Sequence, residues 1–141
     1  ARDWWAALQT RYEHDDVRFL ADAVDATPLP QDLFDSVADN LLTNALRKRQ
    51  SQPDVAVEVR LALQPLVCLT VTDSGAPAPE HVARNLFLSP VASDFGLGVG
   101  LYQAARQAAR SGYRLELPEN RAGRVMFRLQ ATDSRPTDTP G

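Results

Sequence analysis

The sequence is short of cysteine, of positive charge and of long apolar runs. Its single cysteine, Cys68, excludes a disulfide framework within the chain. The net charge is −3, so no excess of basic residues points to nucleic acid or to an anionic membrane surface. The apolar run over 61–71 is broken by Gln64 and Pro65 and is too short to span a bilayer, and no signal-peptide pattern is present. These absences favour a cytoplasmic domain without direct membrane contact, either free or as the cytoplasmic part of a membrane-anchored protein.

The length of 141 residues suits one domain. We expect this domain to span residues 1–130, with a disordered tail over 131–141. Because the chain begins at Ala1 rather than Met, we also expect it to be part of a longer protein. The first helix is predicted over 2–12, and its apolar stripe favours packing on the domain's own core over continuation of a preceding helical domain. That stripe consists of Trp4, Trp5, Leu8 and Tyr12.

Apolar periodicity predicts the remaining elements. Helices are expected over 31–49 and 98–110, one or two helical turns within 80–88, strands over 17–23, 55–63 and 66–72, and a hairpin over 113–129 with its turn at 119–123. Strands with one apolar face and helices with one apolar stripe can bury each other as two layers. We therefore predict an α+β fold, a two-layer sandwich with a mixed, mostly antiparallel sheet and helices on one face.

Three glycines alternate with apolar residues around the start of the predicted helix over 98–110. They are Gly96, Gly98 and Gly100. Glycine permits a close backbone approach, and the first turn of a helix presents unpaired N–H groups and the positive end of its dipole. This pattern is typical of a phosphate site, although a flexible loop before a surface helix would also produce it.

The helix over 31–49 carries polar residues that lie along one stripe beside its apolar face: Asn40, Asn44 and Arg47, flanked by Lys48. Asparagine is disfavoured inside helices because its side chain competes for backbone hydrogen bonds. Carboxamide oxygens are hard ligands that suit Mg²⁺, and the two cations could reach phosphate oxygens. The alternative is a solvated polar face that ends in a basic last turn.

An aspartate, Asp73, stands at the end of the strand over 66–72 and is followed by Ser74 and Gly75. A carboxylate there could accept a hydrogen bond from an exocyclic amine, as adenine has, and would repel the carbonyl of guanine. An Asx turn that merely closes the strand explains the same residues.

Taken together and in this order, these motifs resemble those of the ATP-binding catalytic domain of sensor histidine kinases. That family shares its Bergerat-type fold with DNA gyrase B, MutL and the ninety-kilodalton heat-shock chaperone. The resemblance covers roughly residues 15 to 130. Its parts are 37–45 (VADNLLTNA) as the asparagine box, 73–75 and 96–101 as the two glycine boxes, Leu86-Phe87 as the phenylalanine box, and Gly123 as the last glycine of the fold.

The resemblance implies ATP and Mg²⁺ as cofactors and gives each residue a role. Asn44 would be the catalytic residue that ligates Mg²⁺, with Asn40 beside it. Arg47 and Lys48 would contact phosphate, Asp73 would bind the adenine amino group, and Gly75 would let the base lie against the loop. The phosphates would be held by the second glycine box, namely Gly96, Leu97, Gly98, Val99, Gly100 and Leu101.

The reaction implied is transfer of the ATP γ-phosphoryl group to a histidine on an upstream dimerisation domain, and then to the receiver domain of a response regulator. His14 lacks the long helical hairpin that surrounds an acceptor histidine, so we expect the acceptor outside this chain. Two alternatives remain, a serine kinase of the anti-sigma-factor type and a non-catalytic pseudokinase that binds partners. The chain departs from the family pattern at Lys48, Pro77 and Asp94, where an aromatic residue, a glycine and a lysine are common.

Overall fold

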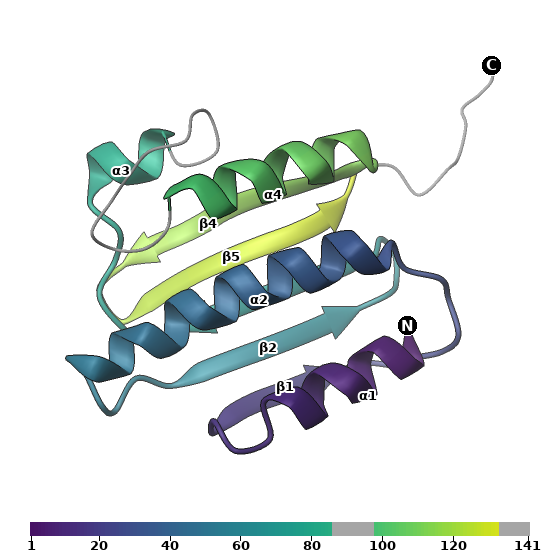
Figure 1. Cartoon of the computed structure of the whole chain (residues 1–141), viewed down its shortest axis with the longest axis horizontal. Coiled ribbons are helices and arrows are strands. Elements are labelled where there is room, and N and C mark those ends of the chain that lie inside the picture. The colour runs from purple at the N-terminus through teal and green to yellow at the C-terminus, as the bar shows by residue number, and fades with distance from the viewer. Residues whose placement is uncertain (86–97, 133–141) are drawn as a thin grey trace.

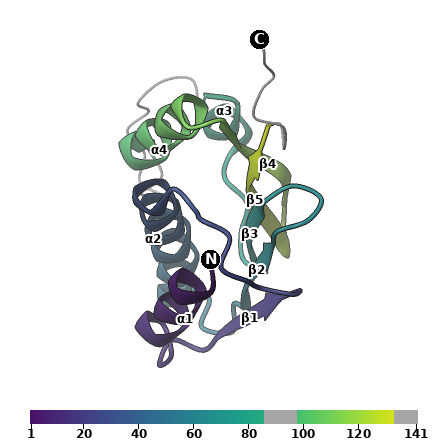
Figure 2. The same cartoon turned by 90° about the vertical axis from the view of Figure 1, so that its right-hand side faces the viewer.

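Helices and a five-stranded sheet form two layers in the computed structural model, which describes residues 1–85 and 98–132. Figure 2 shows α1, α2 and α4 in one layer and the sheet in the other. The helices are α1 (Arg2–Arg11), α2 (Gln31–Arg47), the 3₁₀ turn η1 (Lys48–Gln50), α3 (Glu80–Asn85) and α4 (Gly98–Arg110). The strands are β1 (Val17–Ala21), β2 (Val57–Ala62), β3 (Cys68–Asp73), β4 (Tyr113–Arg121) and β5 (Arg124–Ala131). The predicted α+β class is confirmed.

The sheet has the order β1-β2-β3-β5-β4 (Figure 1). Strands β1 and β2 are parallel, and the other three neighbouring pairs are antiparallel. The predicted mixed, mostly antiparallel sheet is therefore confirmed. In β2 the alternation of the sequence places Val57, Val59 and Leu61 on the buried face and leaves Arg60 exposed on the other, as expected when one face of a sheet meets the core.

The core lies between the sheet and the apolar stripes of the three long helices. Phe34 of α2 is fully buried. Its ring makes edge-on contacts with Trp4 of α1, at 5.3 Å between centroids, and with Tyr113 of β4, at 5.5 Å. Because Trp4, Trp5 and Leu8 are all buried, α1 is an integral part of the core, and the interpretation that it packs on its own domain is confirmed.

Some predicted boundaries were wrong by a few residues. Strand β1 ends at Ala21, and α2 gives way to η1 after Arg47. The largest difference is in the hairpin, where residues 119–121 extend β4 and the turn is only Ala122-Gly123. A register shift between Glu116 and Glu119 lets these polar residues continue the pairing with β5.

Two other calls fall partly on residues that are not described. Residues 86–97, which include Leu86-Phe87, Gly96, Leu97 and Asp94, and residues 133–141 of the expected tail lie outside the described residues. The first residue of that expected tail, Ala131, is the last residue of β5. Within residues 1–85 and 98–132, no helix has both the length and the apolar character that crossing a membrane requires.

Candidate functional site

A cavity of about 360 Å³ opens beside the C-terminal end of α2. Its volume is within the range of ligand-binding pockets. Asn44, Arg47 and Lys48 line one side, the loop over 76–78 lines another, and Val125 and Phe127 of β5 give it an apolar wall. Residues 50–52, just after α2, complete the lining. Three of the residues predicted to bind a nucleotide therefore meet at one pocket.

Asn44 is a buried polar residue on the wall of this cavity, with 7% of its surface exposed. Within residues 1–85 and 98–132, its carboxamide has no hydrogen-bond partner. A buried polar group without a partner is costly and calls for a water, an ion or a ligand. The packing of α2 fixes this position, because Leu41, Leu42 and Ala45 beside it are in the core.

Asn40, one turn earlier, is placed differently. Its side-chain nitrogen donates to the Ser36 carbonyl oxygen at 2.7 Å. Its side-chain oxygen lies so close to Gly100 that a methyl group added at Gly100 would overlap it. Asn40 is not among the residues that line the cavity. Asn40 therefore lies in the contact between α2 and α4. The contact of Asn40 with nucleotide and metal stays a prediction.

Asp73 and Lys48, predicted to bind different parts of ATP, form an ion pair. The Lys48 Nζ atom donates to both carboxylate oxygens of Asp73, each at 3.0 Å, and to the Ala76 carbonyl oxygen at 2.8 Å. The Asp73 side chain is 3% exposed and that of Lys48 is 18% exposed. Because this pair is largely shielded from water, its attraction is screened much less than that of a surface pair.

The loop after β3 is fixed from three sides. The Gly75 N–H donates to Asp73 Oδ1 at 2.8 Å, which is the Asx-type turn that was left open as an alternative role for the aspartate. Asn120 of β4 bonds both the N–H and the carbonyl of Ala78, each at 2.9 Å. The tip of the β4–β5 hairpin also reaches this loop, since the Gly123 N–H donates to the Gly75 carbonyl at 3.1 Å. The cavity wall formed by 76–78 is therefore held rigidly.

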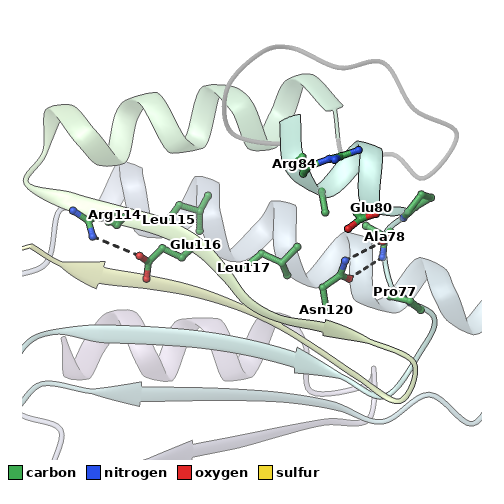
Figure 3. A pocket seen from close by; sticks show the side chains of 11 residues that line it. Pro77, Ala78, Glu80, Arg84, Arg114, Leu115, Glu116, Leu117 and Asn120 are labelled. Carbon is green, nitrogen blue, oxygen red and sulfur yellow. Dashed lines mark hydrogen bonds and ion pairs between the residues drawn. The ribbon is translucent and has the colours of Figure 1, made fainter.

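A larger cavity, of about 810 Å³, lies on the other side of the same loop, between α3 and β4 (Figure 3). Its wall carries Glu80 and Arg84 from α3, and Arg114 and Glu116 from β4. These last two form an ion pair at 3.6 Å. None of the predicted nucleotide-binding residues lines it. We place the candidate site in the smaller cavity because chemistry, rather than volume, distinguishes the two.

The second glycine box is only partly described. Helix α4 begins at Gly98, as predicted, and continues through Val99 and Gly100. Leu101 belongs to the core, with 1% of its surface exposed, so its side chain is not on the cavity wall. Any contact of these four residues with phosphate stays a prediction, as it does for Gly96 and Leu97.

Sequence reasoning missed Val125 and Phe127 as cavity residues and Asn120 as a clamp on the loop. Alternation in β5 does place both apolar residues on the inner face, but no local pattern says that the cavity opens beside them. The Lys48–Asp73 pair was also missed, because it joins positions 25 residues apart. Only the tertiary structure brings these groups together.

The fit of Mg²⁺ rests on Asn44. Among the residues that the structure describes, no three His, Cys, Asp or Glu side chains gather as a metal site. Mg²⁺ keeps several waters and takes few protein oxygens when it is bound beside phosphates. A single buried carboxamide on a cavity wall, next to the cationic Arg47, fits such a site.

Comparison with known proteins identifies similar sequences and folds. Residues 30–133 match a family described as histidine kinase-, DNA gyrase B-, and HSP90-like ATPases. No significant match to a curated protein was found. The catalytic domain of histidine kinase ThkA has a similar structure, with a TM-score of 0.69 and 21% sequence identity, and the match covers 92% of this chain and 89% of that domain.

Two longer histidine kinase structures are also similar. The histidine kinase domain of the blue-light activated kinase from Erythrobacter litoralis EL346 matches with a TM-score of 0.63 and 16% identity, over 91% of this chain and 60% of that one. ThkA in complex with the response regulator protein TrrA matches with a TM-score of 0.63 and 19% identity, over 92% of this chain and 38% of that kinase. At such identities the likeness concerns the fold.

Proposed function

Because the chain belongs to the family of histidine kinase-, DNA gyrase B- and HSP90-like ATPases, we propose that it is the ATP-binding catalytic domain of a two-component sensor histidine kinase. It transfers the γ-phosphoryl group of ATP to a histidine on a dimerisation domain outside this sequence. Its further partner is the receiver domain of a response regulator, and the crystallised complex of ThkA with TrrA supports this kind of partner.

The observation that carries the proposal is the buried carboxamide of Asn44 on the wall of the cavity, which has no hydrogen-bond partner among the described residues. When bound, ATP and Mg²⁺ supply the phosphoryl group and neutralise much of its charge. Asn44 holds the metal, Arg47 attracts the phosphate oxygens, and Val125 and Phe127 bury the base. Phosphoryl transfer needs mainly such positioning and charge stabilisation.

The surroundings of Asp39 favour a histidine acceptor over a serine acceptor. A serine hydroxyl needs a base to take its proton, whereas a neutral imidazole is already a nucleophile. Asp39 is the acidic residue of α2 adjacent to Asn40, but its carboxylate accepts hydrogen bonds from Arg11 and Tyr12 on the side of α1. It does not line the cavity and is poorly placed to serve as that base.

Calorimetric titration with ATP, with and without Mg²⁺, tests the site. Binding of the wild-type chain should tighten with Mg²⁺, and Asn44→Ala should lose most of that increase because Asn44 is the metal ligand. Gln31→Ala is the matched control, since Gln31 is an exposed carboxamide at the opposite end of α2, and it should bind like wild type. If Asn44→Ala keeps the full Mg²⁺ effect, the proposed metal site is wrong.

A transfer assay tests the acceptor. The domain is supplied with its upstream helical domain and radiolabelled ATP, and the label on protein is exposed to acid. A phosphohistidine loses the label in acid, whereas a phosphoserine keeps it. An acid-stable label would show that our proposal is wrong and would favour a serine kinase of the anti-sigma-factor type.

A non-catalytic nucleotide-binding module is the second candidate. The observation that favours it is the Lys48 side chain, which covers both Asp73 and Gly75 in the structure. This candidate predicts binding of nucleotide without labelling of any protein in the same assay.

A further inference from the structure

Of the two residues in the ion pair, Lys48 is the one that faces the cavity. Lys48 lines the cavity, whereas Asp73 does not. The stem of the lysine also lies over Gly75, because a Cβ atom added at Gly75 would be 2.8 Å from Lys48 Cδ. Both positions that the resemblance gives to adenine recognition are therefore behind this one side chain.

The hydrogen bonds of the pair define what a base would find there. Asp73 Oδ1 accepts from the Gly75 N–H and from Lys48 Nζ, while Oδ2 accepts from Lys48 Nζ alone. An ionised carboxylate has about four acceptor sites, and an ammonium group has three donors. The Asp73 side chain is 3% exposed and does not line the cavity, so its oxygens stay behind the lysine. The donor that Lys48 directs at the Ala76 carbonyl can turn toward a ligand, so the pair presents a cationic donor to the cavity.

Adenine and guanine differ at the group that faces such a pair. Adenine carries a donor amine at C6, where guanine carries an acceptor carbonyl. A lone carboxylate accepts from the amine and repels the carbonyl, so it selects adenine. The ammonium group of Lys48, which stands in front of this carboxylate, can donate to the carbonyl of guanine but has no acceptor for the amine of adenine.

We infer that Lys48 determines base specificity in this domain, and that it makes the site accept 6-keto purine nucleotides such as GTP as well as ATP. This inference rests on the proposed function, because it requires the cavity to bind a nucleoside triphosphate. The inference gives Lys48 and Arg47 different roles, although both line the same cavity. Lys48 contacts the base, whereas Arg47 contacts the phosphates, which are the same in both nucleotides.

The test is the ratio of the dissociation constants for GTP and ATP, measured by calorimetry with the same Mg²⁺ concentration. For wild type we expect a ratio below about 10, because a hydrogen bond to a charged group is worth roughly 10-fold or more in affinity and Lys48 supplies one to the guanine carbonyl. Lys48→Met should raise the ratio at least about 10-fold by leaving the guanine carbonyl against a carboxylate. Lys48→Arg, which keeps a cationic donor, should keep the wild-type ratio.

Arg47→Met is the matched control. It removes one cation from the same wall but does not touch Asp73, so both nucleotides should weaken together and the ratio should stay constant. A wild-type preference for ATP above about 10-fold would overturn the inference while leaving the proposed function in place, since a penalty of that size or more is what an unpaired polar group imposes. An unchanged ratio in a folded Lys48→Met variant would also overturn it.

A thermal melt shows whether Lys48→Met folds. If it does not, the wild-type ratio alone decides whether the site accepts GTP as well as ATP or prefers ATP. A wild-type chain that binds neither nucleotide with Mg²⁺ would refute the proposed function, and the inference would fall with it.

Discussion

Replacing Gly100 by alanine tests the contact that Gly100 of α4 makes with Asn40 of α2. The new methyl group would stand 3.3 Å from Asn40 Cγ and would overlap the side-chain oxygen of Asn40. Alanine is favoured over glycine by about 1 kcal/mol inside a helix, whereas forcing a group into a packed site costs about 1–3 kcal/mol. Because Asn40 is also tied to the Ser36 carbonyl, it cannot turn away freely. We expect Gly100→Ala to lower the free energy of unfolding by up to about 2 kcal/mol, because the overlap costs at least as much as the helix gains.

A double-mutant cycle isolates this overlap. Asn40→Ala alone should change stability little, since the loss of one hydrogen bond of about 0.5–1.5 kcal/mol is partly offset by the higher helix propensity of alanine. In Asn40→Ala/Gly100→Ala the methyl group has room, so the two changes should couple by about 1–3 kcal/mol in the stabilising direction. Urea denaturation followed by the fluorescence of Trp4 and Trp5, which are both buried, gives the four free energies. A coupling below about 0.5 kcal/mol, within the error of additivity, would refute the proposed contact.

Three further predictions concern the core, the loop and the pH dependence. Phe34→Ala should cost about 3–5 kcal/mol in urea denaturation, because it empties a fully buried site. Asn120→Ala should cost about 1–3 kcal/mol by leaving the N–H and carbonyl of Ala78 unpaired, and should weaken nucleotide binding as the loop loosens. Burial and the neighbouring Asp39 carboxylate raise the pKa of Tyr12 from 10.0 to about 12, so the stability due to the neutral phenol is present below pH 10 and is lost as the pH rises toward 12. In Tyr12→Phe this loss should be absent. When the phenolate absorbance of the variant is titrated with base, the step at the highest pH should be missing.

Much of the fold could be predicted because the patterns that produce it are local. Alternation over 55–63 identifies β2 and its buried face, and the three glycines before an alanine-rich segment place the start of α4 at Gly98. The tryptophan stripe of α1 marks the face that enters the core. Each signal depends only on residues within one element, so tertiary packing reinforces it.

The misses share a different cause. Residues 119–121 are polar and look like a turn, yet they pair with β5 because a register shift after Glu116 keeps the ladder going. Asn40 and Asn44 lie on one stripe of α2. Because α4 packs beside this stripe, Asn40 contacts Gly100, whereas Asn44 lines the cavity. Which of two equivalent side chains faces a site depends on the neighbouring element, and the sequence of α2 alone does not contain that information.

In the proposed site, the Lys48–Asp73 ion pair bears on ligand recognition as well as on stability. Removing one partner of a buried pair typically costs 3–5 kcal/mol, because the other charge is left buried and uncompensated. With its side chain 3% exposed, Asp73 would pay this cost if a ligand displaced Lys48 entirely, since an exocyclic amine brings a donor but no full charge. A base therefore binds more favourably when the lysine stays beside the carboxylate and only its bond to the Ala76 carbonyl is exchanged. In the proposed complex, the ammonium group that neutralises Asp73 is then part of the surface that contacts the base.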